Sequence, residues 1–259
     1  MMETLHIALV SYINTRPFMD GFDRYFHGEG IEFHLMPPAD CARHLHSGDC
    51  QMALVPVGSL LDFQQIGILP NYCIGANGPV ESVCIFSHVP IEEVDTLILD
   101  SHSRSSNGLA MILLKHHWNI SPQIKRPLQR DFDQIQGKTA GVIIGDQAIR
   151  VYHDYPYVYD LSAAWQDLTG LPFAFAVWAY QPDAFSPKVL GQLETAMGYG
   201  VANARQSAQR WADHYQIDPA YADHYLHRCI DYRFDPDKHR AMEWYLSLLK
   251  EIQIPAPQS

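Results

Sequence analysis

The stretch that decides the fold reads Asp100-Ser-His-Ser-Arg-Ser-Ser-Asn107. It follows the apolar run Thr96-Leu-Ile-Leu99 and precedes Gly108-Leu-Ala-Met-Ile-Leu-Leu114, which is typical of a buried helix. A strand that ends in hydroxyl-bearing residues and then opens a helix brings backbone N–H groups and side-chain donors together. Such a place favours an anion, and the planar cation of Arg104 suits a carboxylate or a phosphate. An ordinary helix cap is the alternative interpretation.

Strand-like and helix-like segments alternate on both sides of this stretch. Strands are predicted at Leu5–Val10, Ile31–Met36, Met52–Val57, Tyr72–Gly75, Ser82–Ser87, Thr96–Leu99, Thr139–Ile144, Tyr157–Tyr159 and Phe173–Tyr180. Helices are predicted between most of them, and the chain from Pro187 onward is predicted to be a helical tail. This order indicates an α/β fold, in which ligands bind at the carboxyl ends of the strands.

The sequence contains two successive blocks of alternating strands and helices with no linker between them. This arrangement indicates two lobes, with the chain passing from the first lobe to the second and back again. We expect residues 1–82 and 178–259 to form lobe 1, residues 83–177 to form the inserted lobe 2, and a ligand cleft to lie between them. Each lobe should hold a mixed, mostly parallel sheet flanked by helices. The alternative is a single doubly wound domain.

The composition limits the possible functions. Of the 259 residues, 47% are hydrophobic and 18% are charged, as in a globular protein. The net charge of −11 argues against a nucleic-acid or anionic-membrane surface, so an anionic ligand needs a local site. The first ten residues lack the features of a secretion signal, and the five scattered cysteines include no Cys-x-x-Cys pair. We therefore expect a cytoplasmic protein with reduced thiols.

Several common site patterns are absent from the sequence. It contains no nucleophile elbow, no Walker loop and no dinucleotide-binding glycine motif. The histidines that lie close together in sequence join no cysteine or carboxylate in a recognisable ligand pattern, so we expect structural or exposed roles and no metal. These histidines are His44 with His46, His116 with His117, and His224 with His227. Trp165, Trp178 and Tyr180 are interpreted as core or hinge residues.

Seven short segments occur in one order over residues 5–180. They are Val10-Ser-Tyr-Ile-Asn-Thr-Arg-Pro-Phe18, Ala53-Leu-Val-Pro56, Gly78-Pro-Val-Glu-Ser-Val83, Ser103-Arg-Ser-Ser106, Ile144-Gly-Asp146, Tyr159-Asp-Leu161 with Trp165, and Thr169-Gly-Leu-Pro-Phe-Ala-Phe-Ala-Val-Trp178. Together they make the chain resemble the menaquinone-biosynthesis chorismate dehydratases of the futalosine pathway, which have the two-lobed fold of type II periplasmic binding proteins. Ser105 stands where threonine is common in that family, a change that keeps the hydroxyl.

The resemblance implies dehydration of chorismate to 3-[(1-carboxyvinyl)oxy]benzoate by a hydro-lyase, without a metal or an organic cofactor. Loss of the C3 proton and of the C4 hydroxyl makes the ring aromatic. The enzyme must hold a dianion, stabilise the developing charge and assist the departing hydroxyl. The expected partner is therefore a small dicarboxylate, with no nucleic acid and no membrane, and self-association stays open.

The substrate-binding residues follow from the helix-terminus argument and from the resemblance. Ser103, Ser105 and Ser106 would hold one carboxylate, together with backbone amides, and Ser82 would hold the other. Asn14 would bond the ring hydroxyl and assist its departure, with a turn or cap role as the alternative.

Each of the charged candidates has alternative roles. Asp146 is a candidate base, although an aspartate at this position also suits a helix cap. The preceding residue, Gly145, is a candidate substrate contact. Arg16 and Arg104 either steer the dianion or form salt bridges. We favour the enolpyruvyl carboxylate of the substrate as the proton acceptor.

Two other functions remain open on the sequence. The enzyme of the same pathway that makes dihydroxynaphthoate shares the fold, although the Ser103-Arg-Ser-Ser106 segment favours the dehydratase. A non-enzymatic solute-binding protein for a small carboxylate is the third possibility.

Overall fold

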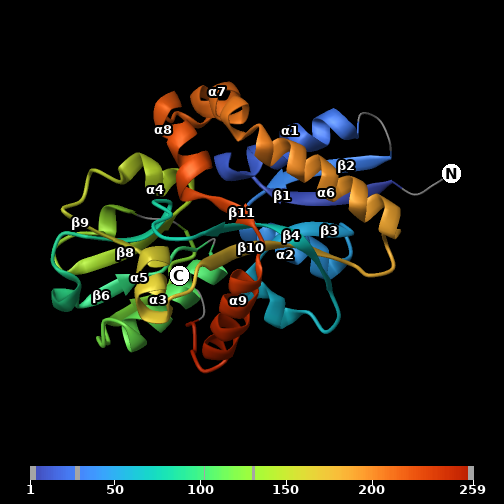
Figure 1. The fold of residues 1–259 in the computed structure, drawn as a ribbon. Coiled ribbons are helices and arrows are strands. Elements are labelled where there is room, and N and C mark those ends of the chain that lie inside the picture. The colour runs from blue at the N-terminus through green and yellow to red at the C-terminus, as the bar shows by residue number, and fades with distance from the viewer. Residues whose placement is uncertain (1–3, 27–29, 102, 130–131, 256–259) are drawn as a thin grey trace.

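The computed structural model describes residues 4–26, 30–101, 103–129 and 132–255, so His102 of the opening stretch lies outside it. Two sheets flanked by helices form two lobes, one at each side of the view in Figure 1. The first sheet has the order β11-β4-β10-β3-β1-β2, and the second has the order β7-β6-β8-β5-β9. The two-lobed α/β fold expected from the sequence is confirmed.

The strands have the following bounds. The first sheet contains β1 (Leu5–Val10), β2 (Ile31–Met36), β3 (Met52–Pro56), β4 (Gly67–Ala76), β10 (Phe173–Tyr180) and β11 (Asp231–Arg233). The second contains β5 (Val83–Ser87), β6 (Thr96–Ile98), β7 (Gln123–Lys125), β8 (Thr139–Ile144) and β9 (Tyr157–Asp160).

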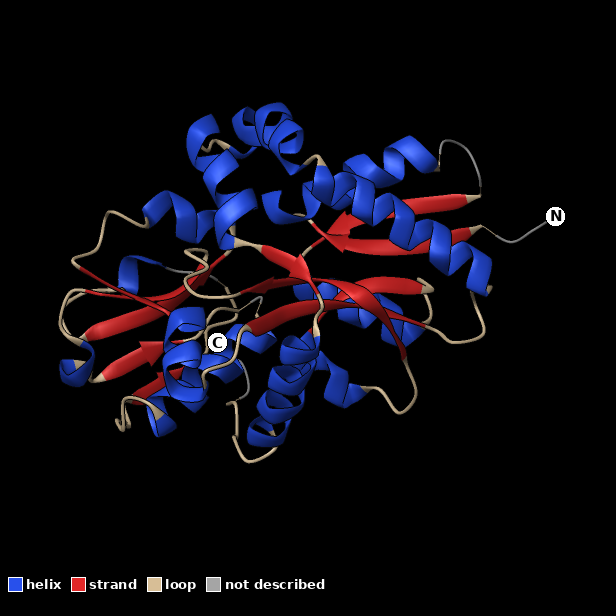
Figure 2. Ribbon diagram, viewed as in Figure 1, coloured by secondary structure: helices blue, strands red, loops and turns tan. Residues whose placement is uncertain are grey.

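Helices cover both faces of the first sheet, as Figure 2 shows. In the first lobe they are α1 (Arg16–Tyr25), α2 (Pro38–Ser47), α6 (Pro187–Ala202), α7 (Ala204–Tyr215), α8 (Pro219–His224) and α9 (Pro236–Leu249). In the second lobe they are α3 (Arg104–His116), α4 (Asp146–Val151) and α5 (Leu161–Thr169). Within the described ranges, none of the helices is both long enough and apolar enough to cross a membrane.

Both sheets are mixed, but the antiparallel pairs are more numerous than expected. Strands β1, β2 and β3 run parallel, as do β6, β7 and β8. The other neighbours are antiparallel. The chain leaves the first lobe along β4 and returns along β10, so these two neighbours necessarily run in opposite directions.

The second crossing between the lobes precedes Phe173. Strand β10 pairs with β3 and β4 from Phe173 to Tyr180, so residues 173–177, which the sequence placed in lobe 2, lie in the first sheet. An apolar run shows that a strand is buried, but it does not show in which sheet. We therefore propose a lobe 2 that extends from β5 to α5.

The tail is not wholly helical, contrary to the prediction. It contains strand β11, which pairs with β4, and a π-helix at Tyr225–Cys229 directly after α8. Strand β11 has only three residues, which is too short for the alternation of buried and exposed side chains to be recognised in the sequence. A π-helix of this kind often lies at a functional site.

The core confirms two minor expectations. Trp165 and Trp178 are fully buried, and their rings contact Phe173 and Phe18, respectively, edge to face. The five cysteines are buried, unpaired thiols.

Candidate ligand pocket between the lobes

A pocket lies where the two lobes meet. It is lined by Val10, Tyr12, Asn14, Pro38, Leu54, Pro56, Ile74, Val80, Ser82, Val83, Ser103, Ser105, Ser106, Ile144, Gly145, Phe175, Ala176 and Ile230. Six of the nine predicted site residues are therefore brought together. None of the described lining residues carries a charge, so the wall is apolar with a few hydroxyl and amide groups, as in many small-molecule sites.

The first turn of α3 supplies three of these hydroxyls. Ser103 is the N-cap, and its Oγ accepts a hydrogen bond from the backbone N–H of Ser106 at 3.2 Å. Ser103 also lines the pocket, so the capping role and the site role coexist. Because α3 has 13 residues, its N-terminus presents a partial positive charge to the pocket.

Ser105 connects the two lobes beside the pocket. Its Oγ accepts a hydrogen bond from the backbone N–H of Gly58 at 3.0 Å. Its backbone carbonyl accepts one from the hydroxyl of Tyr245 at 2.9 Å. A Cβ at Gly58 would lie 3.1 Å from the Tyr245 hydroxyl and 3.3 Å from the Ser105 backbone, so a larger residue there would displace these groups by a few tenths of an ångström.

Tyr225 of the π-helix connects Asn14 to Ser82. The Asn14 amide nitrogen donates to the Tyr225 hydroxyl at 3.2 Å, and that hydroxyl donates to Ser82 Oγ at 2.8 Å. Burial raises the pKa of Tyr225 well above its ordinary value, so the phenol stays protonated. Because Ser82 accepts this proton, its own hydroxyl hydrogen is free to point to a ligand.

Sequence reasoning missed Tyr225, because the tail carries no recognisable motif. No spacing in the sequence connects Tyr225 with Asn14, which lies 211 positions earlier. Tyr12, another pocket residue, lay within a quoted motif but was not selected.

Gly145 and Asp146 join the lobes at the start of α4. Gly145 has φ +67°, and a Cβ there would lie 2.7 Å from the ring of Tyr12. Asp146 lies outside the pocket lining, and its Oδ1 accepts a hydrogen bond from the backbone N–H of Ile13 at 3.1 Å. Its position is the first turn of α4, with Gly145 as the N-cap, so Asp146 connects α4 to the segment that carries Asn14.

The predicted cations also lie outside the pocket lining. Arg16 is buried, donates from Nε to the Tyr215 hydroxyl at 2.6 Å, and stacks 4.1 Å over the Trp211 ring. This contact is not a salt bridge, which was one of the two roles expected for Arg16. Arg104 forms a salt bridge with Asp62, which is one of the two expected roles.

A second, cationic pocket adjoins the first through Ser103, which lines both. Arg43, Arg104 and Arg126 lie along it. Burial and the nearby Arg104 cation lower the pKa of Arg126. Arg43 pairs with Asp40 and Arg104 pairs with Asp62, which also lines this pocket, so carboxylates offset much of the positive charge of the three arginines.

Asp160 stabilises the segment in which the chain first passes from the first lobe to the second. One of its carboxylate oxygens accepts hydrogen bonds from the N–H groups of Val80 and Glu81, at 2.8 and 2.6 Å. The other caps α5 through Ser162 and Ala163. Burial raises the pKa of this carboxyl, and the four backbone donors oppose the rise. Asp160 therefore positions Ser82, which follows Glu81.

The two lobes with a pocket between them are the fold of the periplasmic binding proteins. The product of the Candida albicans CA3427 gene, described with the generic fold of that class, superposes with a TM-score of 0.70 at 12% identity, covering 98% of this chain and 92% of its own. The aliphatic sulphonate binding protein SsuA of Escherichia coli gives 0.63 at 15% identity, covering 100% and 94%. Protein AF1704 of Archaeoglobus fulgidus gives 0.73 at 16% identity, covering 95% and 97%.

More specifically, the chain belongs to the menaquinone biosynthesis family, whose model matches residues 5–251. It is 29% identical over 256 residues to the chorismate dehydratase of Thermus thermophilus, covering 92% of each chain. The family resemblance read from the seven sequence segments is thereby confirmed.

Proposed function

We propose that this protein is a chorismate dehydratase, a hydro-lyase that converts chorismate to 3-[(1-carboxyvinyl)oxy]benzoate and water in the cytoplasm, on the futalosine route to menaquinone. The observation that carries the proposal is the single pocket that gathers Asn14, Ser82 and Ser105 from the two lobes. The Thermus relative supports the same reaction.

The pocket suits a dianion that loses water. The first turn of α3, with Ser103, Ser105 and Ser106, binds one carboxylate, and Ser82, oriented by Tyr225, binds the other. Asn14 bonds the ring hydroxyl. An amide offers two hydrogens and one oxygen, so Asn14 retains bonding capacity for a ligand while it donates to Tyr225. Of the three arginines of the adjoining pocket, Arg43 and Arg104 pair with Asp40 and Asp62, so Arg126 is the one that we expect to attract the dianion to this entrance.

The reaction breaks the C3–H bond and the C4–O bond and forms a double bond between C3 and C4. Because no charged side chain is among the described lining residues, the enolpyruvyl carboxylate of the substrate takes the C3 proton. The enolpyruvyl carboxyl group then gives the C3 proton to the departing hydroxyl, which leaves as water, and Asn14 stabilises the departing oxygen. No oxidant or reductant is needed.

Replacing Asp146 with asparagine tests this assignment of the base. The asparagine oxygen still accepts from the N–H of Ile13, so kcat should fall less than about tenfold, whereas loss of a general base costs about 100-fold or more. Steady-state kinetics would give kcat, and equilibrium titration would give chorismate affinity. Loss of turnover with normal binding would identify Asp146 as the base.

Replacing Ser105 with alanine should raise KM about tenfold. The change leaves the N–H of Gly58 without its acceptor at 3.0 Å, which costs about 1–3 kcal/mol in the closed pocket, and it removes a hydroxyl from the carboxylate site. Ser105→Thr is the matched control, since it keeps the hydroxyl and should keep KM near the wild-type value. Equal KM values for the alanine and threonine variants would contradict the assigned role.

Incubation of the purified protein with chorismate tests the proposed function. The expected result is the ultraviolet spectrum of an aromatic enolpyruvyl ether, with a product mass lower than that of chorismate by one water. Binding of chorismate without a spectral change would indicate a solute-binding protein instead. Absence of both binding and turnover would contradict the choice of substrate.

A further inference from the structure

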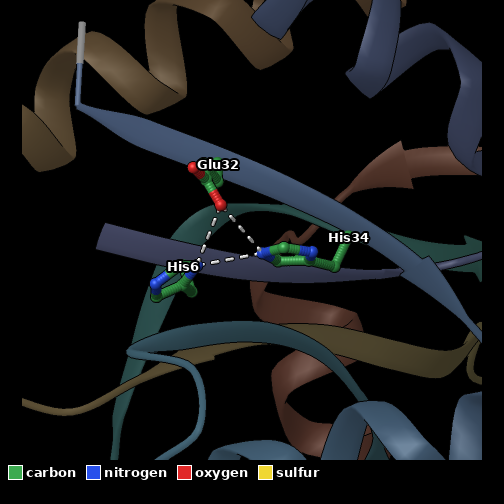
Figure 3. Close-up of side chains that lie close together, drawn as sticks. All are labelled: His6, Glu32 and His34. Atoms are coloured by element: carbon green, nitrogen blue, oxygen red, sulfur yellow. Dashed lines mark hydrogen bonds and ion pairs between the residues drawn. The ribbon is translucent and has the colours of Figure 1, made fainter. Parts of the chain in front are cut away.

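Three side chains that the proposed reaction does not use converge at the edge of the first sheet. His6 lies near the start of β1, and Glu32 and His34 lie on β2, the edge strand. The strands are parallel, with His6 paired to Glu32. Alternation along β2 puts Glu32 and His34 on one face. Figure 3 shows the three side chains directed toward one another.

The distances between their ligand atoms match a metal coordination shell. His6 Nδ1 lies 3.0 Å from His34 Nε2 and 3.5 Å from Glu32 Oε2, and His34 Nε2 lies 3.8 Å from the same oxygen. Tetrahedral zinc with bonds of about 2.0–2.2 Å places its ligand atoms about 3.3–3.6 Å apart. Movements of a few tenths of an ångström would therefore bring all three atoms to bonding distance.

The geometry points to a binding site for a divalent transition metal of the Zn²⁺ type, with His6, Glu32 and His34 as its three protein ligands. Two imidazole nitrogens and one carboxylate oxygen suit Zn²⁺, Ni²⁺ or Cu²⁺ rather than Mg²⁺ or Ca²⁺, which prefer all-oxygen sites. The side chains are 36%, 60% and 43% exposed, respectively, so water can reach the remaining coordination position. The metal would clamp the edge strand β2 to β1.

The site is separate from the ligand pocket. His6 precedes the pocket residue Val10 by four positions on the same strand, a span of about 13 Å. The metal-binding proposal can therefore be tested independently of the proposed dehydratase activity.

A second group of potential ligands consists of Glu81, His224 and Cys229. Cys229 Sγ lies 3.4 Å from His224 Nε2, which lies 3.6 Å from a Glu81 oxygen. Burial raises the pKa of the Cys229 thiol to about 12, so ionisation of this ligand is costly. Only the second group includes a sulfur ligand, so the absorption spectrum of bound Co²⁺ distinguishes the two groups.

The test is calorimetric titration of the metal-free 259-residue chain with Zn²⁺, followed by titration with Co²⁺ monitored by visible and near-ultraviolet absorption. We expect one high-affinity Zn²⁺ per chain, a higher thermal midpoint with the metal, and cobalt d–d bands without a sulfur-to-metal charge-transfer band. Glu32→Gln and the double variant His6→Ala/His34→Ala should bind about 100-fold more weakly or worse. His224→Ala should bind as the wild type does.

Both sets of variants should keep wild-type chorismate turnover, which also shows that they are folded. If the double variant does not fold, Glu32→Gln decides the matter, because its side chain is largely exposed. Unchanged affinity in Glu32→Gln, loss of binding in His224→Ala, or a sulfur charge-transfer band would each overturn the proposal. Failure of the wild type to bind Zn²⁺ would overturn it as well.

Discussion

Asn14→Ala is expected to lower kcat/KM for chorismate about 100- to 1,000-fold, as removal of a transition-state hydrogen-bond donor does in other enzymes. The buried amide of Asn14 lines the pocket and donates to Tyr225. Its loss removes the group that stabilises the departing hydroxyl and also leaves Tyr225 without one of its two partners. Most of the effect should appear in kcat, because the departing oxygen gains charge only as the C4–O bond breaks. Initial rates of aromatic product formation would measure it.

Two variants separate this chemical role from a structural one. Asn203→Ala deletes the same amide at the junction of α6 and α7, where it bonds the Tyr199 carbonyl, and should leave kcat unchanged. Tyr225→Phe keeps Asn14 but breaks the connection to Ser82, so its smaller loss should lie mainly in KM. Equal losses for Asn14→Ala and Tyr225→Phe would mean that Asn14 acts only through Tyr225. Wild-type turnover by Asn14→Ala would refute the assignment.

Sequence patterns predicted the buried strands well, because their apolar runs are covered on both faces. Strands Leu5–Val10, Thr139–Ile144 and Phe173–Tyr180 have the bounds expected from the sequence, and so does the partly exposed edge strand Ile31–Met36. The short edge strands β7 and β11 were missed, since three residues are too few to carry a periodic signal. Strand direction was also not readable, because it depends on how the chain crosses between the lobes.

The site residues divide by chemical type. The hydroxyl, amide and glycine candidates, among them Asn14 and Ser82, line the pocket, whereas Arg16, Arg104 and Asp146 do not. Those three were selected because a charged group suits an anionic substrate or proton transfer. Arg16 and Asp146 are buried, where a charge without a partner is costly, and they contact the Tyr215 hydroxyl and the N–H of Ile13. Arg104 is partly exposed and pairs with Asp62. Contacts between positions so distant in sequence exist only in the folded chain.

Gly145→Ala is expected to lower kcat/KM about 100-fold. At φ +67° and ψ −149° the backbone is in a region that residues with a Cβ rarely adopt, at a cost of about 1–3 kcal/mol. The added methyl would also lie 2.7 Å from the Tyr12 ring, so either the ring moves or the lobes separate. Both movements change the pocket that Tyr12 and Gly145 line together, so KM should rise as kcat falls. Steady-state kinetics and chorismate titration would measure the two effects.

Gly170→Ala is the matched control for the backbone. Gly170 has φ +72° at the end of α5, and a Cβ there would have no atom within 4 Å among the described residues. This variant should lose thermal stability but keep chorismate affinity, since its left-handed backbone carries strain without a contact at the pocket. The difference in KM between the two glycine variants therefore reports the contact between Gly145 and Tyr12. If both variants showed the same small loss of stability and wild-type KM, the two lobes would not need to meet at Tyr12 for chorismate to bind.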